Sequence, residues 1–203
     1  MKKFFLFIPQ SSEQMLHECK YEAIDNSLLD YGTTRFPAIP LINAHVEKGD
    51  RITVVPVLYQ LEECEANLCR FEAELDALCS SKGITCDVDP VRIPNDNGIA
   101  MMLLVYQELI GKVNPDDELY ADITFGAKPM PIVLAMVLQY AYRTQDNATI
   151  ECVTYGQVNH HEEPKTARIY DVTALVQLDE IVRLLAEKRV ANPASVIAGI
   201  IGE

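Results

Sequence analysis

The chain of 203 residues has few basic residues for its number of acidic ones. It contains 17 Lys and Arg against 30 Asp and Glu, so its formal net charge is −13. A protein that coats DNA or RNA needs a broad basic surface, so this balance argues against a long nucleic acid as a partner. A small anionic ligand remains compatible with it, because one or two cations in a local site can hold such a ligand.

Long hydrophobic runs are also missing. The first residues, Met-Lys-Lys-Phe-Phe-Leu-Phe-Ile, resemble a signal peptide, but their apolar run of five residues stops at Pro9. That run is too short for the core of a secretory signal. No other window approaches the ~20 apolar residues that a membrane span requires. We therefore expect a cytoplasmic protein with no membrane partner.

The cysteine pattern lacks any CxxC pair among its six residues. Several cysteines fall on apolar faces of the predicted elements, which favours reduced core thiols over a disulfide framework or a zinc site. One other group has metal-binding residue types, His160-His161-Glu162-Glu163. Nothing there fixes the spacing of ligands, so we predict a solvated hairpin loop and no metal ion.

Two nucleotide fingerprints are absent, the dinucleotide pattern GxGxxG and the phosphate loop GxxxxGK[ST]. We therefore predict no NAD or ATP site and no cofactor. Hydrophobic residues nevertheless make up 49 % of the chain, which is enough for the core of one domain.

Apolar runs and helical periodicities alternate along the chain. This alternation predicts an α/β protein with a Rossmann-like, doubly wound and mainly parallel sheet of six strands. The last two strands should form an antiparallel hairpin at the edge of this sheet. Residues 13–34 fit neither pattern clearly. The predicted strands are 4–8, 51–58, 84–93, 119–124, 148–155 and 168–172, and the predicted helices are 39–46, 61–78, 99–110, 129–142, 175–188 and 193–201.

The most informative stretch is Tyr120-Ala-Asp-Ile-Thr-Phe-Gly-Ala-Lys-Pro-Met-Pro131. It predicts a strand that ends at Thr124, a turn at Gly126, and a helix whose first turn contains prolines, where the missing N–H has no partner to lose. Free amides at a helix N-terminus beside Lys128 and a threonine hydroxyl suit a phosphate group.

A second loop is expected to face this turn. In the commonest doubly wound order, 3-2-1-4-5-6, the first and fourth strands are neighbours where the winding reverses, and ligands bind beyond their carboxyl ends. Assuming that order, two loops line the crevice. One loop consists of Pro9, Gln10, Ser11 and Ser12, and the other of Thr124, Phe125, Gly126, Ala127 and Lys128.

Each of these features has a simpler interpretation. A glycine–lysine turn can be a mere connection between elements, and Ser11 and Ser12 can cap a helix instead of binding a ligand. Arg35 either contacts the same anion or is a surface charge. Asn97, in the segment Asn95-Asp96-Asn97-Gly98, either belongs to a loop that gates the crevice or simply forms a turn.

The segment Asp122-Ile-Thr-Phe-Gly-Ala-Lys-Pro-Met130 resembles the D-x-T-x-G-x-[KR]-x-[ML] motif of CARF domains, the CRISPR-associated Rossmann-fold sensors. The short first strand with its serine-containing turn and the segment Ile169-Tyr-Asp-Val-Thr173 are also similar to that family. The resemblance covers roughly residues 1–190 as a sensor domain and leaves 191–203 as a short C-terminal helix.

The resemblance implies a homodimer that binds a cyclic oligoadenylate, an RNA second messenger of type III CRISPR antiviral defence, across its two-fold axis. Cyclic tetra-adenylate is the favoured ring. Thr124, Gly126 and Lys128 would contact phosphate or ribose, with residues 9–12 as the partner loop. Binding without turnover is expected, because no histidine or carboxylate stands out as a general base in either loop.

Other functions stay open at this point, and no catalytic residue is assigned. A ring nuclease would use Lys128 to stabilise developing charge and Ser11 or Thr124 to orient the 2′-hydroxyl. A nucleotide-processing enzyme would need Asp122 as its carboxylate, although Asp122 is expected to bond the amides of its own turn. The apolar C-terminal helix suits contact with a fused or separate effector, or a pure protein-interaction role.

Overall fold

The computed structural model describes residues 1–96, 98–159 and 166–201. These residues form one mixed sheet of nine strands, which runs in the order β3-β2-β9-β8-β7-β1-β4-β5, with β6 also paired to β4. The strands are β1 Lys2–Phe7, β2 Cys19–Ala23, β3 Thr33–Thr34, β4 Arg51–Tyr59, β5 Thr85–Val88, β6 Val91–Ile93, β7 Glu118–Asp122, β8 Thr149–Asn159 and β9 Thr166–Asp171.

The predicted α/β fold and its strand order are confirmed. The six strands expected from the sequence correspond to β1, β4, the pair β5 and β6, β7, β8 and β9, and they lie in the order 3-2-1-4-5-6. β1 is central and pairs in parallel with both β4 and β7. Its residues from Phe4 to Phe7 are buried, as both faces of a central parallel strand require.

The sheet is wider than predicted on one side. β8 and β9 form the expected antiparallel pair, but β9 is not an edge strand, because β2 pairs with it in parallel and β3 extends the sheet further. The segment that forms β2 alternates in burial, with Cys19 and Tyr21 inside and the residues between and after them exposed. This period of two is the signature of a strand with one buried face.

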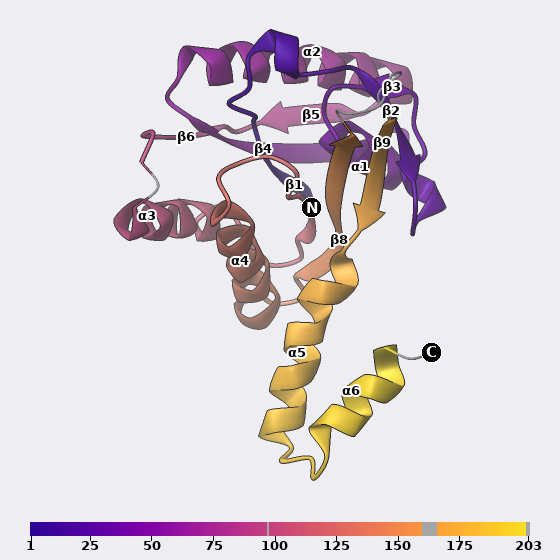
Figure 1. Ribbon diagram of the computed structural model, residues 1–203, viewed down its shortest axis with the longest axis vertical. Coiled ribbons are helices and arrows are strands. Elements are labelled where there is room, and N and C mark those ends of the chain that lie inside the picture. The colour runs from indigo at the N-terminus through magenta and orange to yellow at the C-terminus, as the bar shows by residue number, and fades with distance from the viewer. Residues whose placement is uncertain (97, 160–165, 202–203) are drawn as a thin grey trace.

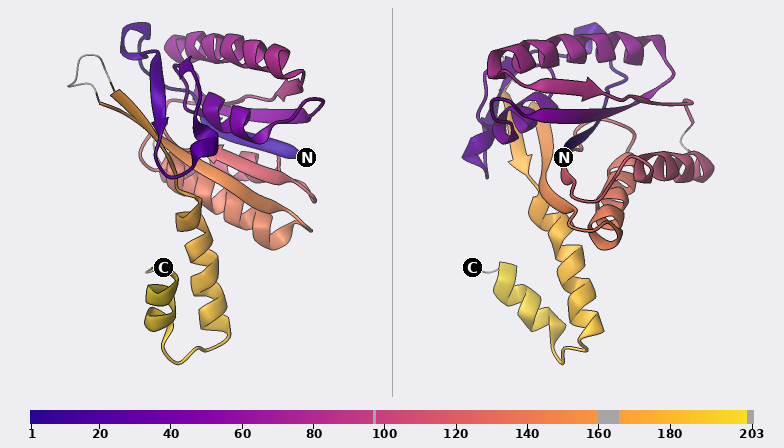
Figure 2. Two further views of the ribbon diagram at one scale, coloured as in Figure 1. Left: turned by 90° about the vertical axis from the view of Figure 1, so that its right-hand side faces the viewer. Right: turned by 180° about the vertical axis from the view of Figure 1, so that it is seen from behind.

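The helices cover both faces of the sheet. α1 and α2 lie on one face, and α3 and α4 pack together on the other (Figures 1 and 2). α2 ends at Gly83, whose φ of 68° provides the left-handed C-cap that glycine favours. The helices are α1 Ala38–His45, α2 Glu62–Lys82, α3 Ile99–Ile110, α4 Met130–Thr144, α5 Thr173–Glu187 and α6 Pro193–Ile201, with short 3-10 turns at η1 Glu13–Met15 and η2 Ser27–Leu29.

The last two helices form an arm, residues 173–201, that projects from the body of the molecule (Figure 1). α5 leaves the sheet after β9, and α6 folds back beside it. Thr173 is the only buried residue of α5, and α6 has none. The arm therefore adds almost nothing to the core of its own chain.

The cysteines behave as predicted. All six are free thiols, and Cys19, Cys64, Cys79 and Cys152 are buried. Burial raises the pKa of the Cys152 thiol to about 12, so this side chain stays protonated. Within the described ranges, no helix combines the length and apolar composition that crossing a membrane requires.

Candidate functional site

The carboxyl ends of β1 and β7 meet where the sequence predicted a crevice. Gly126 lies against Phe7, the last residue of β1. A Cβ atom added at Gly126 would stand 3.0 Å from Phe7 Cγ and 3.3 Å from Met130 Cβ. The φ of Gly126 is +95°, a conformation that L side chains rarely adopt. Backbone angle and close approach therefore both require glycine in this turn.

The turn, residues 124–128, is fixed from below by the carboxylate of Asp122. Asp122 is 1 % exposed and accepts three hydrogen bonds. The Thr154 hydroxyl donates to its Oδ2 at 2.9 Å, the Thr124 hydroxyl to the same oxygen at 3.0 Å, and the Thr124 N–H to Oδ1 at 3.3 Å. Asp122 thus bonds the amide of its own turn, as expected, and also joins β7 to β8.

The Thr124 hydroxyl is used twice within the protein. It donates to Asp122, and its oxygen accepts the N–H of Gly156 at 2.7 Å. Gly156 is in turn held close to α1, because a Cβ there would lie 2.5 Å from Pro37 Cγ. Thr124 can donate to a bound anion only by giving up its bond to the carboxylate. Its clearest role is to position the turn that follows it.

Burial raises the pKa of Asp122 to about 6, and the bonds from Thr154 and Thr124 offset only part of this effect. The carboxylate lies under the turn and has no exposed surface from which to act on a ligand. It is a structural acceptor, which weakens its candidacy as the catalytic base of a nucleotide-processing enzyme.

The loop after β1, residues 9–12, is held by a residue that the sequence did not single out. Asn67 of α2 is fully buried, and its side-chain amide donates to the carbonyls of Pro9 at 2.9 Å and Ser11 at 2.8 Å. Arg70 in turn donates to Asn67 Oδ1 at 2.8 Å. A buried Asn in an acidic amphipathic helix was the available signal, because such a residue needs partners.

The polar groups at the rim of the crevice are available to a ligand. Lys128 is exposed, and no carboxylate pairs with it in the parts of the chain that the structure describes. Ser12 occupies the N-cap position of η1, yet its side chain makes no capping bond. Gln10 and Ser12 are exposed and Ser11 is half-buried, whereas Pro9 is buried and Phe125 and Ala127 pack against the core.

α4 begins directly after Lys128, with Pro129 at its N-cap. The amide ends of this helix point to the same edge of the sheet as the turn. A helix N-terminus favours negative charge. Lysine, helix end and serine hydroxyls together make a site for a phosphate-bearing ligand.

Arg35 is engaged elsewhere. Its guanidinium pairs with Glu74 of α2 at 3.0 Å and with Glu18 at 3.2 Å. The Thr34 hydroxyl donates to the same Glu74 at 2.5 Å. Arg35 therefore stabilises the approach to α1, and an anion would have to compete with two carboxylates for it.

Two sequence predictions fall outside the described residues: Asn97 of the suggested gating loop and the group His160-His161-Glu162-Glu163. Among the residues that are described, no three His, Cys, Asp or Glu side chains come together in a way that would hold a metal ion.

No protein-family model matches the chain, and no curated protein matches it either. The function is therefore argued from the site itself.

Proposed function

We propose that this protein is a cytoplasmic sensor of type III CRISPR antiviral defence that binds a cyclic oligoadenylate, with cyclic tetra-adenylate as the favoured ring. The ligand lies over residues 124–128 and 9–12 at the interface of a homodimer. Each copy then supplies one crevice, and a ring of identical adenylates matches the two-fold symmetry of the protein.

The contact of Gly126 with Phe7 is the observation that carries this proposal. It brings the turn before α4 and the loop after β1 to one crevice at the point where the sheet reverses its winding. The crevice offers an unpaired lysine, a helix N-terminus and hydroxyls, which are the groups that recognise a phosphodiester.

The charge of the chain is consistent with this ligand. At −13 the protein repels long RNA, whereas a small ring needs only one focused cationic site in each copy. Among cations at this rim, Arg35 is already paired with Glu74 and Glu18, so Lys128 is the residue to test.

Lys128→Ala is expected to weaken binding of cyclic tetra-adenylate by about 1.5–3 kcal/mol, the typical value of a hydrogen bond to a charged group. The measurement is isothermal titration of the ring into each variant. Lys48→Ala is the matched control, because Lys48 is an exposed lysine that lies before β4, at the amino edge of the sheet. An affinity for K128A equal to that of K48A would remove Lys128 from the site.

Binding without cleavage is the form of the proposal that the site favours over a ring nuclease. The carboxylate nearest the turn, Asp122, is buried beneath it and bonded by two threonines. Chromatography of the ring after incubation with the protein tests this point. Intact ring is the expected result, and conversion to linear oligoadenylate would establish the nuclease instead.

A further inference from the structure

The arm, residues 173–201, exposes apolar side chains along its whole length. Leu175 is 70 % exposed, and Val182 and Leu184 follow it on α5. On α6 the exposed fractions are 49 % for Ile200 and 66 % for Ile201. An isolated helix of this length is marginal in water, and most helices are stabilised by packing an apolar face. The arm therefore lacks the partner that its sequence requires.

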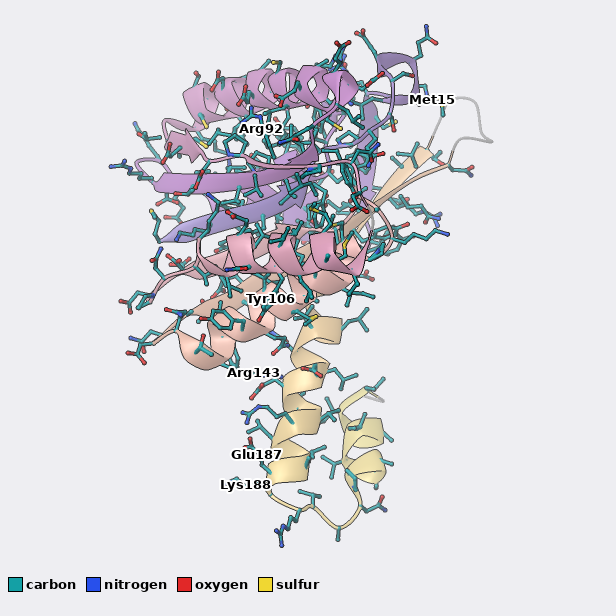
Figure 3. The ribbon with its side chains drawn as sticks, turned by 90° about the vertical axis from the view of Figure 1, so that its left-hand side faces the viewer. Met15, Arg92, Tyr106, Arg143, Glu187 and Lys188 are labelled. Carbon is teal, nitrogen blue, oxygen red and sulfur yellow. The ribbon has the colours of Figure 1, made fainter. Side chains whose placement is uncertain are left out.

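A groove of about 670 Å³ lies at the base of the arm, between α4 and α5. Its walls are mainly apolar and include Ile132, Ala135 and Met136 of α4 and Leu175 and Val176 of α5. Tyr106 of α3 also lines it, and Arg143 of α4 stands at the junction with α5 (Figure 3). No residue of α6 lines the groove.

The groove and α6 lie on opposite sides of α5. In Figure 1 and in both views of Figure 2, α5 separates α6 from α4. The α6 helix of the same chain therefore does not fill the groove in this structure. The unpartnered helix and the unfilled groove are two complementary apolar surfaces of one chain.

We propose that two copies of the chain exchange their arms, so that α6 of each copy lies in the α4–α5 groove of the other. This inference rests on the homodimer of the proposed function and identifies surfaces that form it. Exchange gives a closed, isologous pair, because each copy donates one helix and receives one.

Charge favours an uncharged occupant such as α6. The four charged side chains of α5 are already paired within the chain: Arg143 binds Asp179 at 2.6 Å and Glu180 at 2.9 Å, and Arg183 pairs with Glu180 and Glu187. A charged peptide would find no free partner on α5. α6 has the sequence PASVIAGII and brings no charge that burial would leave unpaired.

Gln139 gives the exchanged helix a register. This residue is 8 % exposed and lines the groove; its amide nitrogen donates to the Val176 carbonyl, and its Oε1 has no donor within the described ranges. Uncharged donors stand at the start of α6, the Asn192 amide and the Ser195 hydroxyl. With α6 antiparallel to α4, this end meets Gln139 and Ile200 meets Ile132, because both axial spans are about 10–12 Å at ~1.5 Å per residue.

Sedimentation velocity of the full chain tests the exchange with two single variants. Met136→Asp places a charge in the groove, and Ile200→Asp places one on α6. Both side chains are about half exposed within their own chain, at 51 % and 49 %, so neither change enters the core. We expect a dimer for the parent chain, and for each variant a dimer dissociation constant raised by roughly 30-fold or more.

Mixing the two variants distinguishes exchange from other contacts. M136D keeps a good α6 and I200D keeps a good groove, so a 1:1 mixture can restore one of the two exchanged contacts. The expected result is a heterodimer that forms more readily than either variant pairs with itself. Leu28→Asp is the matched control, because Leu28 is 62 % exposed on η2, and this variant should stay dimeric.

A monomeric parent chain would overturn the inference, as would a dimer that persists in M136D or I200D, or a mixture that shows no rescue. Titration with cyclic tetra-adenylate reports on the proposed function separately. If the ring binds and the variants stay dimeric, only the exchange fails. If the variants dissociate as expected and no ring binds the parent chain, only the ligand assignment fails.

Discussion

At the scale of single residues, the candidate site is built on one buried carboxylate. Asp122 is bonded by Thr124 and Thr154, and through Thr124 it also fixes the amide of Gly156. These bonds hold the exposed part of the turn in place without taking part in recognition. Rigid positioning of this kind reduces the entropy lost when a ligand binds.

The titration of Asp122 predicts a change of stability with pH. Its pKa is about 6 in the folded protein and near 3.8 in the unfolded chain, so the folded state binds the proton more tightly. The contribution of this group to stability therefore falls as pH rises from about 4 to about 6, by ~3 kcal/mol in all. Above that range the loss is complete and stays constant.

Asp122→Asn removes this titration and leaves every other carboxylate in place. The difference in unfolding free energy, parent chain minus D122N, should therefore decrease across the same pH window. Urea denaturation at a series of pH values measures it. A difference that is independent of pH would show that Asp122 titrates normally.

Gly126→Ala should destabilise the fold for two separable reasons. Its positive φ costs about 1–2 kcal/mol for a residue with a Cβ, and the contact with Phe7 adds overpacking of about 1–3 kcal/mol. Gly49→Ala is the control, because Gly49 has φ +93° and a Cβ atom added there would meet nothing within 4 Å. Denaturant unfolding should give a larger loss for G126A than for G49A. Equal losses would contradict the close packing on Phe7.

The sequence predicted which residues gather at the site better than it predicted what they bind. Gly126 and Lys128 were chosen from the turn alone, and the turn lies where expected. The partners of Thr124 and Arg35 come from elsewhere, since Gly156 and Glu74 are distant in sequence. Asn67 was missed for the same reason, because its two acceptors belong to another element.

At the scale of elements, β1 and β7 are joined at their amino ends by a buried ion pair. Lys3 Nζ lies 2.7 Å from Asp117 Oδ2, and both side chains are at most 5 % exposed. The Lys3 ammonium also donates to the Lys112 carbonyl at 2.6 Å, and Asp117 accepts the Asn114 N–H at 2.7 Å. These bonds fix the two strands whose other ends form the crevice.

Lys3→Met should lower the unfolding free energy by about 3–5 kcal/mol, because it leaves Asp117 buried without its countercharge. The double variant K3M/D117N removes that charge as well and should recover much of the loss. Thermal or urea unfolding of both variants measures the difference. If the double variant is as unstable as the single one, the unpaired charge is not the cause.

The order of the sheet was predictable because it follows from alternating strands and helices with right-handed connections. The outer strand β2 was not assigned, since Met15, Cys19 and Ala23 have helical spacing. Burial of Tyr21 against the sheet, together with pairing to β9, favours the extended form. Tertiary contact therefore decided between two local patterns of similar strength.

At the scale of the whole molecule, the body positions the crevice and the arm offers an interface. α4 belongs to both, because it begins at the crevice and its exposed Ile132 and Met136 line the groove. The sequence indicated that this helix is too apolar to face water. Its inner side is buried in the core, and the arm exchange would cover the rest.

The net charge of −13 also makes a prediction for assembly, since two copies repel each other at long range. Salt screens that repulsion over a Debye length of about 10 Å at 0.1 M. Dimerisation through apolar helices should therefore strengthen with added salt, whereas binding of an anionic ring through Lys128 should weaken.

The central claim is that the crevice between residues 9–12 and 124–128 binds a cyclic oligoadenylate. Isothermal titration of the parent chain with cyclic tri-, tetra- and hexa-adenylate, with linear oligoadenylate as the control, tests it most directly. The account predicts saturable binding of cyclic tetra-adenylate with one ring per two chains, and weaker binding of the linear control. No heat with any of the three rings would contradict it.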